Sequence, residues 1–331
     1  MQTKSQILAF IKSKSLIRIE DLIIEFKISR QMIHRYLKQL QEEGKIEKTG
    51  KSPLVFYQLS NNLDFHKTYD LLHLDESKVF EEIQNLLFLN KKVSAEILRI
   101  INYTFTEMLN NSIDHSQAKK VDISLTLSKT FISFKIKDEG VGIFKNIQKF
   151  FHLDNEIEAI QDLLKGKNTT NNQRHSGEGI FFTSKIASKF EIRSSNYALL
   201  FQEGIPKIKS DLEKFSGTEV SFFLNLDAKK LLKQVFDEYT NEDFEFSTTK
   251  IFVQVFEMGL ELFSRSQAKR LLNNLDKFNH IILDFSQISF IGQGFADEIF
   301  RVYQNDHPET KIEYQNAEPT VEFMIKKVRK S

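Results

Sequence analysis

Apolar residues in the first sixty positions recur at the spacing of helices and then at the spacing of strands. Helical periodicity runs through residues 3–12, 19–26 and 29–43, and Ser29 stands where its hydroxyl can cap the third helix. Gly44 follows, and residues 45–59 contain two alternating runs around Gly50. This pattern predicts three short helices and a β-hairpin.

In the middle of the chain, segments whose apolar residues have helical spacing alternate with segments that have strand spacing. A helix is predicted whose apolar face carries Leu98, Ile101, Phe105, Met108 and Leu109. Strands are predicted over 121–127, 131–136 and 220–224, with a further helix opening at 176–180. Residues 61–92 are expected to be a helical connector.

The last ninety residues form a new unit with strands that alternate with helices. Strands are predicted near 251–256, 280–285 and 311–316, with helices over 264–278 and 319–330. A short turn and another helix lie between the second and third strands. Such alternation predicts a small α/β sandwich.

Composition narrows the class of protein. The 331 residues suggest two or three domains, and there is no cysteine, which excludes disulfides, thiolate metal sites and a cysteine nucleophile. The chain shows no apolar run of membrane length and no signal-peptide core, so we expect a cytoplasmic protein without membrane contact. Its net charge is +1, yet residues 1–59 hold eleven lysines and arginines against six acidic residues.

The order of elements in residues 1–60 resembles a winged helix-turn-helix. Its third helix and wing place polar and basic side chains outward, where they can contact bases and phosphates of duplex DNA. The candidate DNA-binding residues are Ser29, Arg30, Gln31, His34, Arg35, Lys38, Lys48 and Lys51. The alternative is a winged helix that docks on protein.

Polar residues on the central helix suggest phosphate chemistry. Glu107, Asn111 and Asp114 share one face, where a carboxylate and a carboxamide can orient a water and hold a hard cation. By itself this spacing also fits an ordinary solvated face. Three further blocks accompany it: Asp138-x-Gly140-x-Gly142 after a strand, Gly177 and Gly179 before a helix, and Gly217-Thr218 before another strand.

These four blocks, between residues 75 and 226, resemble the GHKL ATPase fold of gyrase, heat-shock chaperones, histidine kinases and MutL. The resemblance implies ATP and Mg2+ as ligands, with Glu107 as the residue that positions or deprotonates the attacking water and Asn111 as the magnesium ligand. It implies that Asp138 accepts the adenine amino group. The remaining implied ATP-binding residues are Asp114, Gly140, Gly142, Lys167, Gly177, Gly179 and Thr218. The polar stretch that contains Lys165, Lys167 and Arg174 resembles the ATP lid.

The segment around Gly292-Gln293-Gly294 resembles the strand-to-helix turn of STAS-like domains, kin to anti-anti-sigma proteins. Those proteins carry a phosphorylated serine at this turn, whereas here the turn has no hydroxyl, and Ser286 and Ser289 precede it. Its glycines either expose amides to an anion or partner or simply meet a need for small residues. Asp297 and Glu298 are interpreted as surface or capping groups.

The predicted fold class is therefore α/β multidomain: a winged helix (1–60), a helical connector (61–92), a GHKL α/β sandwich (93–226) and a small STAS-like α/β domain (240–331). The predicted function is an ATP-binding, slowly hydrolysing, DNA-binding regulator in which nucleotide state alters DNA or partner binding. The alternatives are a protein serine/threonine kinase of the anti-sigma type and a MutL-like ATPase that acts on DNA structure. A protein partner at the STAS-like domain and a homodimer are also open.

Overall fold

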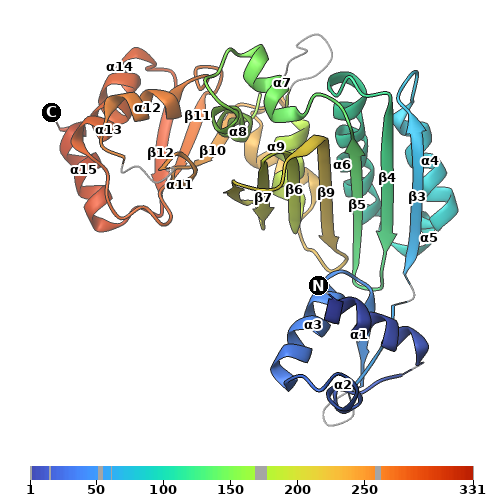
Figure 1. The fold of residues 1–331 in the computed structure, drawn as a ribbon. Coiled ribbons are helices and arrows are strands. Elements are labelled where there is room, and N and C mark those ends of the chain that lie inside the picture. Colours follow the sequence, from blue (N-terminus) through green and yellow to red (C-terminus); the bar gives the residue numbers. More distant parts are fainter. Residues whose placement is uncertain are drawn as a thin grey trace. The chain divides into compact units, whose positions relative to one another are not determined.

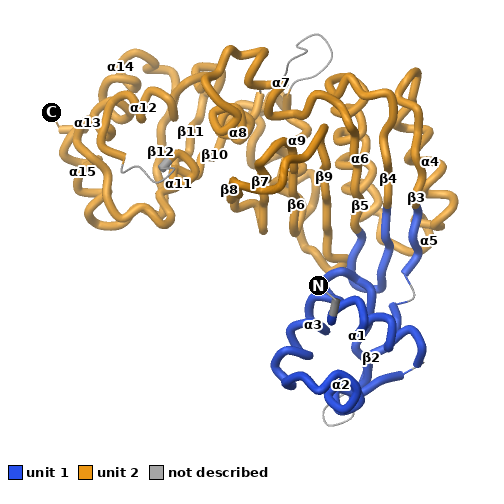
Figure 2. The backbone as a smooth tube through the Cα atoms, viewed as in Figure 1, with its two compact units in different colours: residues 1–65, 125–132 blue, residues 66–124, 133–331 orange. Residues whose placement is uncertain are grey.

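The computed structural model describes residues 2–14, 16–50, 55–60, 62–167, 177–257 and 262–330. The chain divides into two compact units (Figure 2). Unit 1 comprises Met1–Phe65 and Leu125–Ile132, and unit 2 comprises His66–Ser124 and Ser133–Ser331.

Unit 1 contains the three helices and the hairpin that the sequence predicts. The helices are α1 (Gln2–Ser13), α2 (Ile19–Phe26) and α3 (Arg30–Glu42), and strands β1 (Ile46–Thr49) and β2 (Phe56–Leu59) pair antiparallel. The Ser29 hydroxyl accepts a hydrogen bond from the Met32 amide (3.2 Å), which confirms the predicted cap. Ile7, Leu22, Ile33 and Leu37 are buried in a core of their own.

A seven-stranded sheet has the order β3-β4-β5-β9-β6-β7-β8 (Figure 1). Strand β9 pairs antiparallel with β6, β6 with β7, and β7 with β8. The strands are β3 (Leu63–Asp70), β4 (Lys120–Leu127), β5 (Phe131–Asp138), β6 (Lys189–Ser195), β7 (Tyr197–Gln202), β8 (Ile205–Lys209) and β9 (Phe215–Asn225).

Helices cover one face of this sheet. The longest is α6 (Ala95–His115), which packs against α4 (Glu76–Leu87) and α9 (Gly179–Ile186). The ring of Phe105 on α6 meets the ring of Phe134 on β5, with 5.5 Å between centroids. The other helices of this domain are α5 (Leu89–Lys92), α7 (Ile143–Phe150), α8 (Glu156–Lys165) and α10 (Leu232–Tyr239).

The expected helical connector at 61–92 is wrong in part, because Leu63–Asp70 forms the edge strand β3. Only Phe65 of this strand is buried, and most of its other side chains are polar and exposed. An edge strand with one buried residue lacks the clear alternation that marks strands in a sequence. Helices α4 and α5 follow as expected.

The last part of unit 2 contains a three-stranded parallel sheet, β10-β11-β12, with intervening helices. Parallel strands need crossover connections, which the helices supply. The first strand ends at Phe252 rather than near residue 256, because a short helix begins at Gln254. The elements are β10 (Thr248–Phe252), α11 (Gln254–Glu257), α12 (Arg265–Leu272), β11 (His280–Asp284), α13 (Gln293–Asp297), the π-helix η1 (Glu298–Tyr303), α14 (Gln304–Asp306), β12 (Lys311–Gln315) and α15 (Pro319–Arg329).

The end of α8 joins the two sheets of unit 2. The Lys165 side chain, 3% exposed, donates to the carbonyl oxygens of Arg270 (3.1 Å) and Asn273 (2.8 Å) at the end of α12. It also lies 3.4 Å from the Asp162 carboxylate, which accepts from Asn274. Buried polar groups that are satisfied across a junction hold its geometry.

Among the helices described, none is long and apolar enough to cross a membrane.

Candidate functional site

Asp138 is the last residue of β5 and is 2% exposed. Its carboxylate accepts hydrogen bonds from the amides of Gly140 (2.9 Å) and Thr218 (3.2 Å) and from the hydroxyl of Ser112 (3.3 Å). Burial raises the pKa of Asp138, and these three hydrogen bonds oppose the rise only in part. Within the described residues no cation pairs with it. A buried carboxylate without a cation keeps acceptor capacity for a ligand N–H.

Three glycines bring backbone segments close to Asp138. A Cβ on Gly140 would collide with the carbonyl of Ser116, and a Cβ on Gly217 would collide with the carbonyl of Asp138 itself. Gly142 and Gly217 also have φ angles of +82° and +79°, which side chains rarely adopt. The Thr218 hydroxyl accepts from the Ile143 amide (3.0 Å) and so ties β9 to the start of α7. The second and fourth sequence blocks therefore meet at Asp138.

The polar face of α6 runs beside this group. Glu107, Asn111 and Asp114 are half-buried, while Phe105, Met108 and Leu109 on the opposite face are buried. The Glu107 carboxylate lies so close to Gly179 that a Cβ there would collide with it. The first block therefore meets the third at the start of α9.

The pKa of Tyr103 responds to the negative charge near this part of α6. Burial and the nearby carboxylates of Glu107 and Glu178 raise the pKa of its phenol well above the ordinary range. Two carboxylates thus face one region at the start of α9. A divalent cation and a polyphosphate could occupy such a region together, because the cation offsets both sources of negative charge.

The donor set fits magnesium held mainly by a nucleotide. In the part of the chain that the structure describes, no group of three His, Cys, Asp or Glu residues could hold a metal alone. Mg2+ usually takes one or two protein oxygens and completes its shell with phosphates and waters. The Asn111 carboxamide oxygen, one helical turn from Glu107, matches that need.

Two of the predicted lid residues, Lys165 and Lys167, lie against the C-terminal domain. Gly177, at φ +73°, precedes α9, and Arg174 lies outside the described residues. The Lys167 ammonium donates to the carbonyl of Lys277 (2.8 Å) and lies 5.0 Å from the centroid of the Phe278 ring. Lys167 therefore contacts the C-terminal domain here, and its contact with nucleotide stays a prediction.

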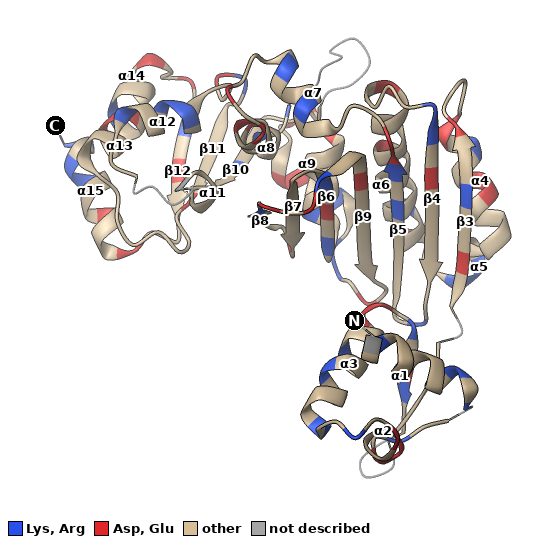
Figure 3. Cartoon of the chain, in the orientation of Figure 1, with Lys and Arg blue, Asp and Glu red and all other residues tan. Residues whose placement is uncertain are grey.

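The candidate DNA-binding residues lie on the surface of unit 1. Each of the seven that the structure describes is exposed: Ser29, Arg30, Gln31, His34, Arg35, Lys38 and Lys48. Arg30 forms an ion pair with Glu20, and the other side of α3 buries Ile33, Leu37 and Leu40. Figure 3 shows the lysine and arginine positions along α3 in blue. Lys51 lies outside the described residues. Basic and amide side chains on the outward face of a third helix suit the major groove.

The turn of the C-terminal domain uses its glycines for packing. A Cβ on Gly292 would lie 2.6 Å from the Cα of Phe263, and the Gly292 amide donates to the Leu262 carbonyl (2.8 Å). The interpretation of Asp297 and Glu298 as surface groups is wrong, because both carboxylates are buried. Asp297 pairs with Arg265 (2.8 Å) and with Arg301, so these ion pairs explain the burial.

Sequence reasoning missed several residues that hold the site together. Ser112 donates to Asp138, and the Ser194 hydroxyl donates to the Gly217 carbonyl (2.7 Å). Ser112 lies one residue after Asn111 on the buried side of α6. Its polarity at an apolar position was the available signal.

Three family models match the chain in separate segments. Residues 3–52 match an HTH domain, residues 75–199 a histidine kinase-like ATPase domain, and residues 267–322 a STAS-like domain of unknown function. A search of curated proteins finds no relative that matches this chain. The chain therefore combines a helix-turn-helix domain, a histidine kinase-like ATPase domain and a STAS-like domain, as the sequence blocks predicted. This combination fits an ATP-binding, DNA-binding regulator.

Proposed function

We propose that this protein binds ATP with Mg2+ at the Asp138 site and that nucleotide state alters how the chain binds duplex DNA or a protein partner. The observation that carries the proposal is the Asp138 carboxylate. It is buried and held by two amides and a hydroxyl, with no cation paired to it in the described residues. A carboxylate in that state can accept the exocyclic amino group of adenine.

The other residues of the site would contact different parts of the nucleotide. Gly140 and Gly142 let the backbone approach the base, and Thr218 holds the network around Asp138. Asn111 would hold Mg2+ against the phosphates, with Asp114 on the same helix face. Gly177 and Gly179 would let the start of α9 approach the phosphates, and Lys167 would be a further phosphate contact. Bound magnesium would neutralise phosphate charge.

Glu107 gives the site a means to hydrolyse ATP. Its carboxylate lies against Gly179, at the start of the helix that would face the terminal phosphate. A carboxylate there can orient a water for in-line attack and accept its proton. We expect turnover to be slow in the absence of a partner.

The junction within unit 2 supplies a route from nucleotide to the STAS-like domain. Lys165 ends α8 and Lys167 follows it, and both ammonium groups donate hydrogen bonds to carbonyls of the STAS-like domain. Nucleotide that contacts Lys167 would therefore bias the position of this junction, and linkage makes the effect reciprocal. DNA binding would occur through residues 1–60. A partner at the STAS-like domain and a homodimer remain part of the proposal.

Nucleotide binding and release of inorganic phosphate test the proposal on the full chain, with and without duplex DNA at low salt. We expect Asp138→Asn to weaken ATP binding by about a hundredfold, because the amide presents an N–H to the adenine amino group. Glu107→Gln should bind ATP and release no phosphate. The matched control is Glu139→Gln, which changes an exposed carboxylate next to Asp138.

Three results would contradict the proposal. Wild type that binds no nucleotide would remove the ATP site, and no affinity for DNA at low salt would remove the DNA role. DNA affinity that is identical with and without ATP, together with partner binding that is equally unaffected, would remove the coupling. Transfer of labelled phosphate to protein instead of water would favour the serine/threonine kinase.

A further inference from the structure

A hollow of about 490 Å3 opens between the STAS-like sheet and the ATPase domain, away from Asp138. One wall is formed by the carboxyl ends of the parallel strands, with Phe252 as the last residue of β10, Ser286 after β11 and Asn316 directly after β12. The opposite wall includes Lys185 of α9 and Tyr239 of α10. The crevice outside the carboxyl ends of parallel strands is where open α/β sheets bind ligands.

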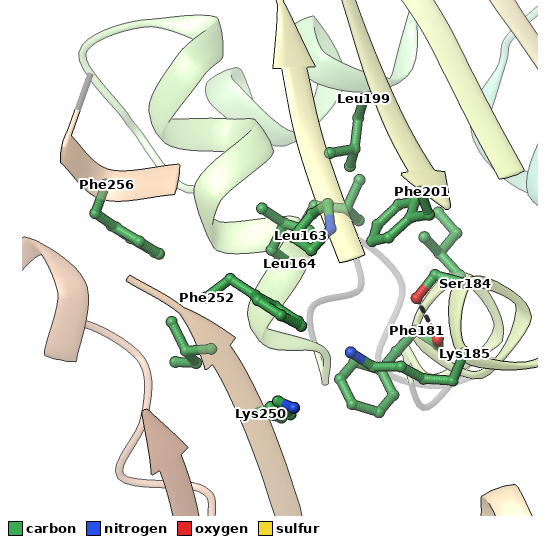
Figure 4. A pocket seen from close by; sticks show the side chains of 13 residues that line it. Leu163, Leu164, Phe181, Ser184, Lys185, Leu199, Phe201, Lys250, Phe252 and Phe256 are labelled. Atoms are coloured by element: carbon green, nitrogen blue, oxygen red, sulfur yellow. Dashed lines mark hydrogen bonds between the residues drawn. The ribbon is translucent and has the colours of Figure 1, made fainter. Parts of the chain in front are cut away.

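Lys185 brings an amine with aromatic neighbours to this hollow. Its ammonium lies 4.8 Å from the ring centroid of Phe181, 5.5 Å from that of Phe252 and 5.7 Å from that of Tyr239. Figure 4 shows Lys185 beside Phe181, with Lys250 and Phe252 nearby. In the described residues the Lys185 ammonium makes no hydrogen bond and no ion pair. Ring faces attract a cation but do not replace a hydrogen-bonded anion.

The other cations of the hollow have carboxylate partners. Lys250 lies 3.1 Å from the Asp284 carboxylate, and Lys230 lies 3.8 Å from that of Glu203. Asp284 also accepts from Ser286, Gln315 and Asn316, so its oxygens are occupied. Lys185 is therefore the cation of this lining that lacks an anion in the described structure.

The surroundings of Lys185 favour loss of its proton. Burial is the main cause, and the positive charges of Lys250 and Lys230 add to it, while Glu238 and Asp284 oppose it; together they lower the pKa to about 7. An anion bound beside the amine would supply the missing partner and restore the charge. Glu238 would compete electrostatically and so favour a ligand with a single anionic group.

We infer that this hollow binds a small organic anion whose carboxylate or phosphate pairs with Lys185 and whose apolar body contacts Tyr239 and Phe252. The inference does not depend on ATP binding, because it uses no residue of the Asp138 site. The volume suits a small organic molecule, and the two rings would contact a planar apolar group.

Calorimetric titration of the full chain with benzoate and with phenyl phosphate tests the inference, with neutral benzyl alcohol as the comparison probe. We expect at least one anion to bind and benzyl alcohol not to bind. The two anions distinguish a carboxylate site from a phosphate site. Lys185→Met should weaken anion binding about tenfold or more, since it keeps the length of the side chain and removes the charge. Lys189→Met, on the exposed side of β6, is the matched control and should change nothing.

Two further measurements keep the inference testable if Lys185→Met fails to fold. Glu238→Gln, at an exposed position of α10, should tighten anion binding at about pH 6, where Lys185 keeps its proton and the substitution removes a charge that repels the anion. In the wild type, affinity should fall by up to about tenfold per pH unit above pH 7, where Lys185 loses its proton. Absence of binding by both anions, equal binding of benzyl alcohol, or anion affinity unchanged by Lys185→Met or by Glu238→Gln would overturn it.

Discussion

Asp138 in the ATPase domain and Asp284 in the STAS-like domain occupy the same local position, yet their surroundings differ. Each is the last residue of a strand and each is 2% exposed. Asp284 pairs with Lys250 and accepts from Ser286, Gln315 and Asn316. Asp138 accepts from two amides and one hydroxyl only.

The pKa values of the two carboxyl groups shift in opposite directions. Burial raises the pKa of both, but the hydrogen bonds from Ser286, Gln315 and Asn316 outweigh burial at Asp284 and lower its pKa. At Asp138 burial prevails and the pKa is raised. The comparison teaches that a buried carboxylate saturated by the protein serves the fold, whereas one left short of partners is available to a ligand.

Asp284→Asn should produce the largest loss of stability. The substitution leaves Lys250 without its anion and places an amide N–H among groups that themselves donate. We expect the free energy of unfolding to fall by about 3 kcal/mol in urea titrations. Asp306→Asn, at an exposed position of α14, should stay within about 0.5 kcal/mol of wild type. A loss as small as that control would show that the Asp284 network does not stabilise the fold.

Gly217→Ala should cost about 2 kcal/mol, because its Cβ would collide with the Asp138 carbonyl at a φ of +79°. Gly204 is the matched control: its φ is +81°, but a Cβ there meets no atom closer than 3.9 Å. Gly204→Ala should therefore cost only about 1 kcal/mol, from backbone strain. Thermal and urea unfolding measure both variants. If the two substitutions lowered the free energy of unfolding equally, the close approach of the backbone at Asp138 would not require glycine.

Asp138→Asn should leave the free energy of unfolding within about 1 kcal/mol of wild type, or above it, because burial disfavours the ionised carboxylate. The same urea titrations measure this. Destabilisation as large as that of Asp284→Asn would show that Asp138 serves the fold in the same way, and the contrast between the two would fail.

The smallest effect is the pH dependence, which should have opposite signs at the two sites. The lowered pKa of Asp284 stabilises the fold above the unfolded-state value near 3.8, and this contribution is lost as pH falls below about 4. The raised pKa of Asp138 means that the folded state gains stability as pH falls through that pKa. Relative to Asp138→Asn, wild type should therefore gain stability as pH falls from neutrality toward the unfolded-state value near 3.8. No change, or a loss, in urea titrations over that interval would contradict the sign.

Sequence reasoning succeeded where local pattern and local chemistry coincide. The Ser29 cap, the register of α6 and the strand that ends at Asp138 all follow from residues near one another in the chain. It does not identify contacts between residues that are distant in the chain. Lys167 meets Lys277 across 110 positions, and Lys185 meets Phe252 from another domain. Strand β3 was missed because an edge strand with one buried residue resembles a solvated segment.

The anchoring of α8 at Lys165 has a consequence for how the protein can be divided. Three family models suggest three modules, but Asp162 and Lys165 of α8 also take hydrogen-bond partners from the STAS-like domain. Removal of the STAS-like domain would expose the Asp162–Lys165 pair to solvent and remove the two carbonyl oxygens to which Lys165 donates. We therefore expect a fragment that contains both of the last two modules to be more stable than either module alone.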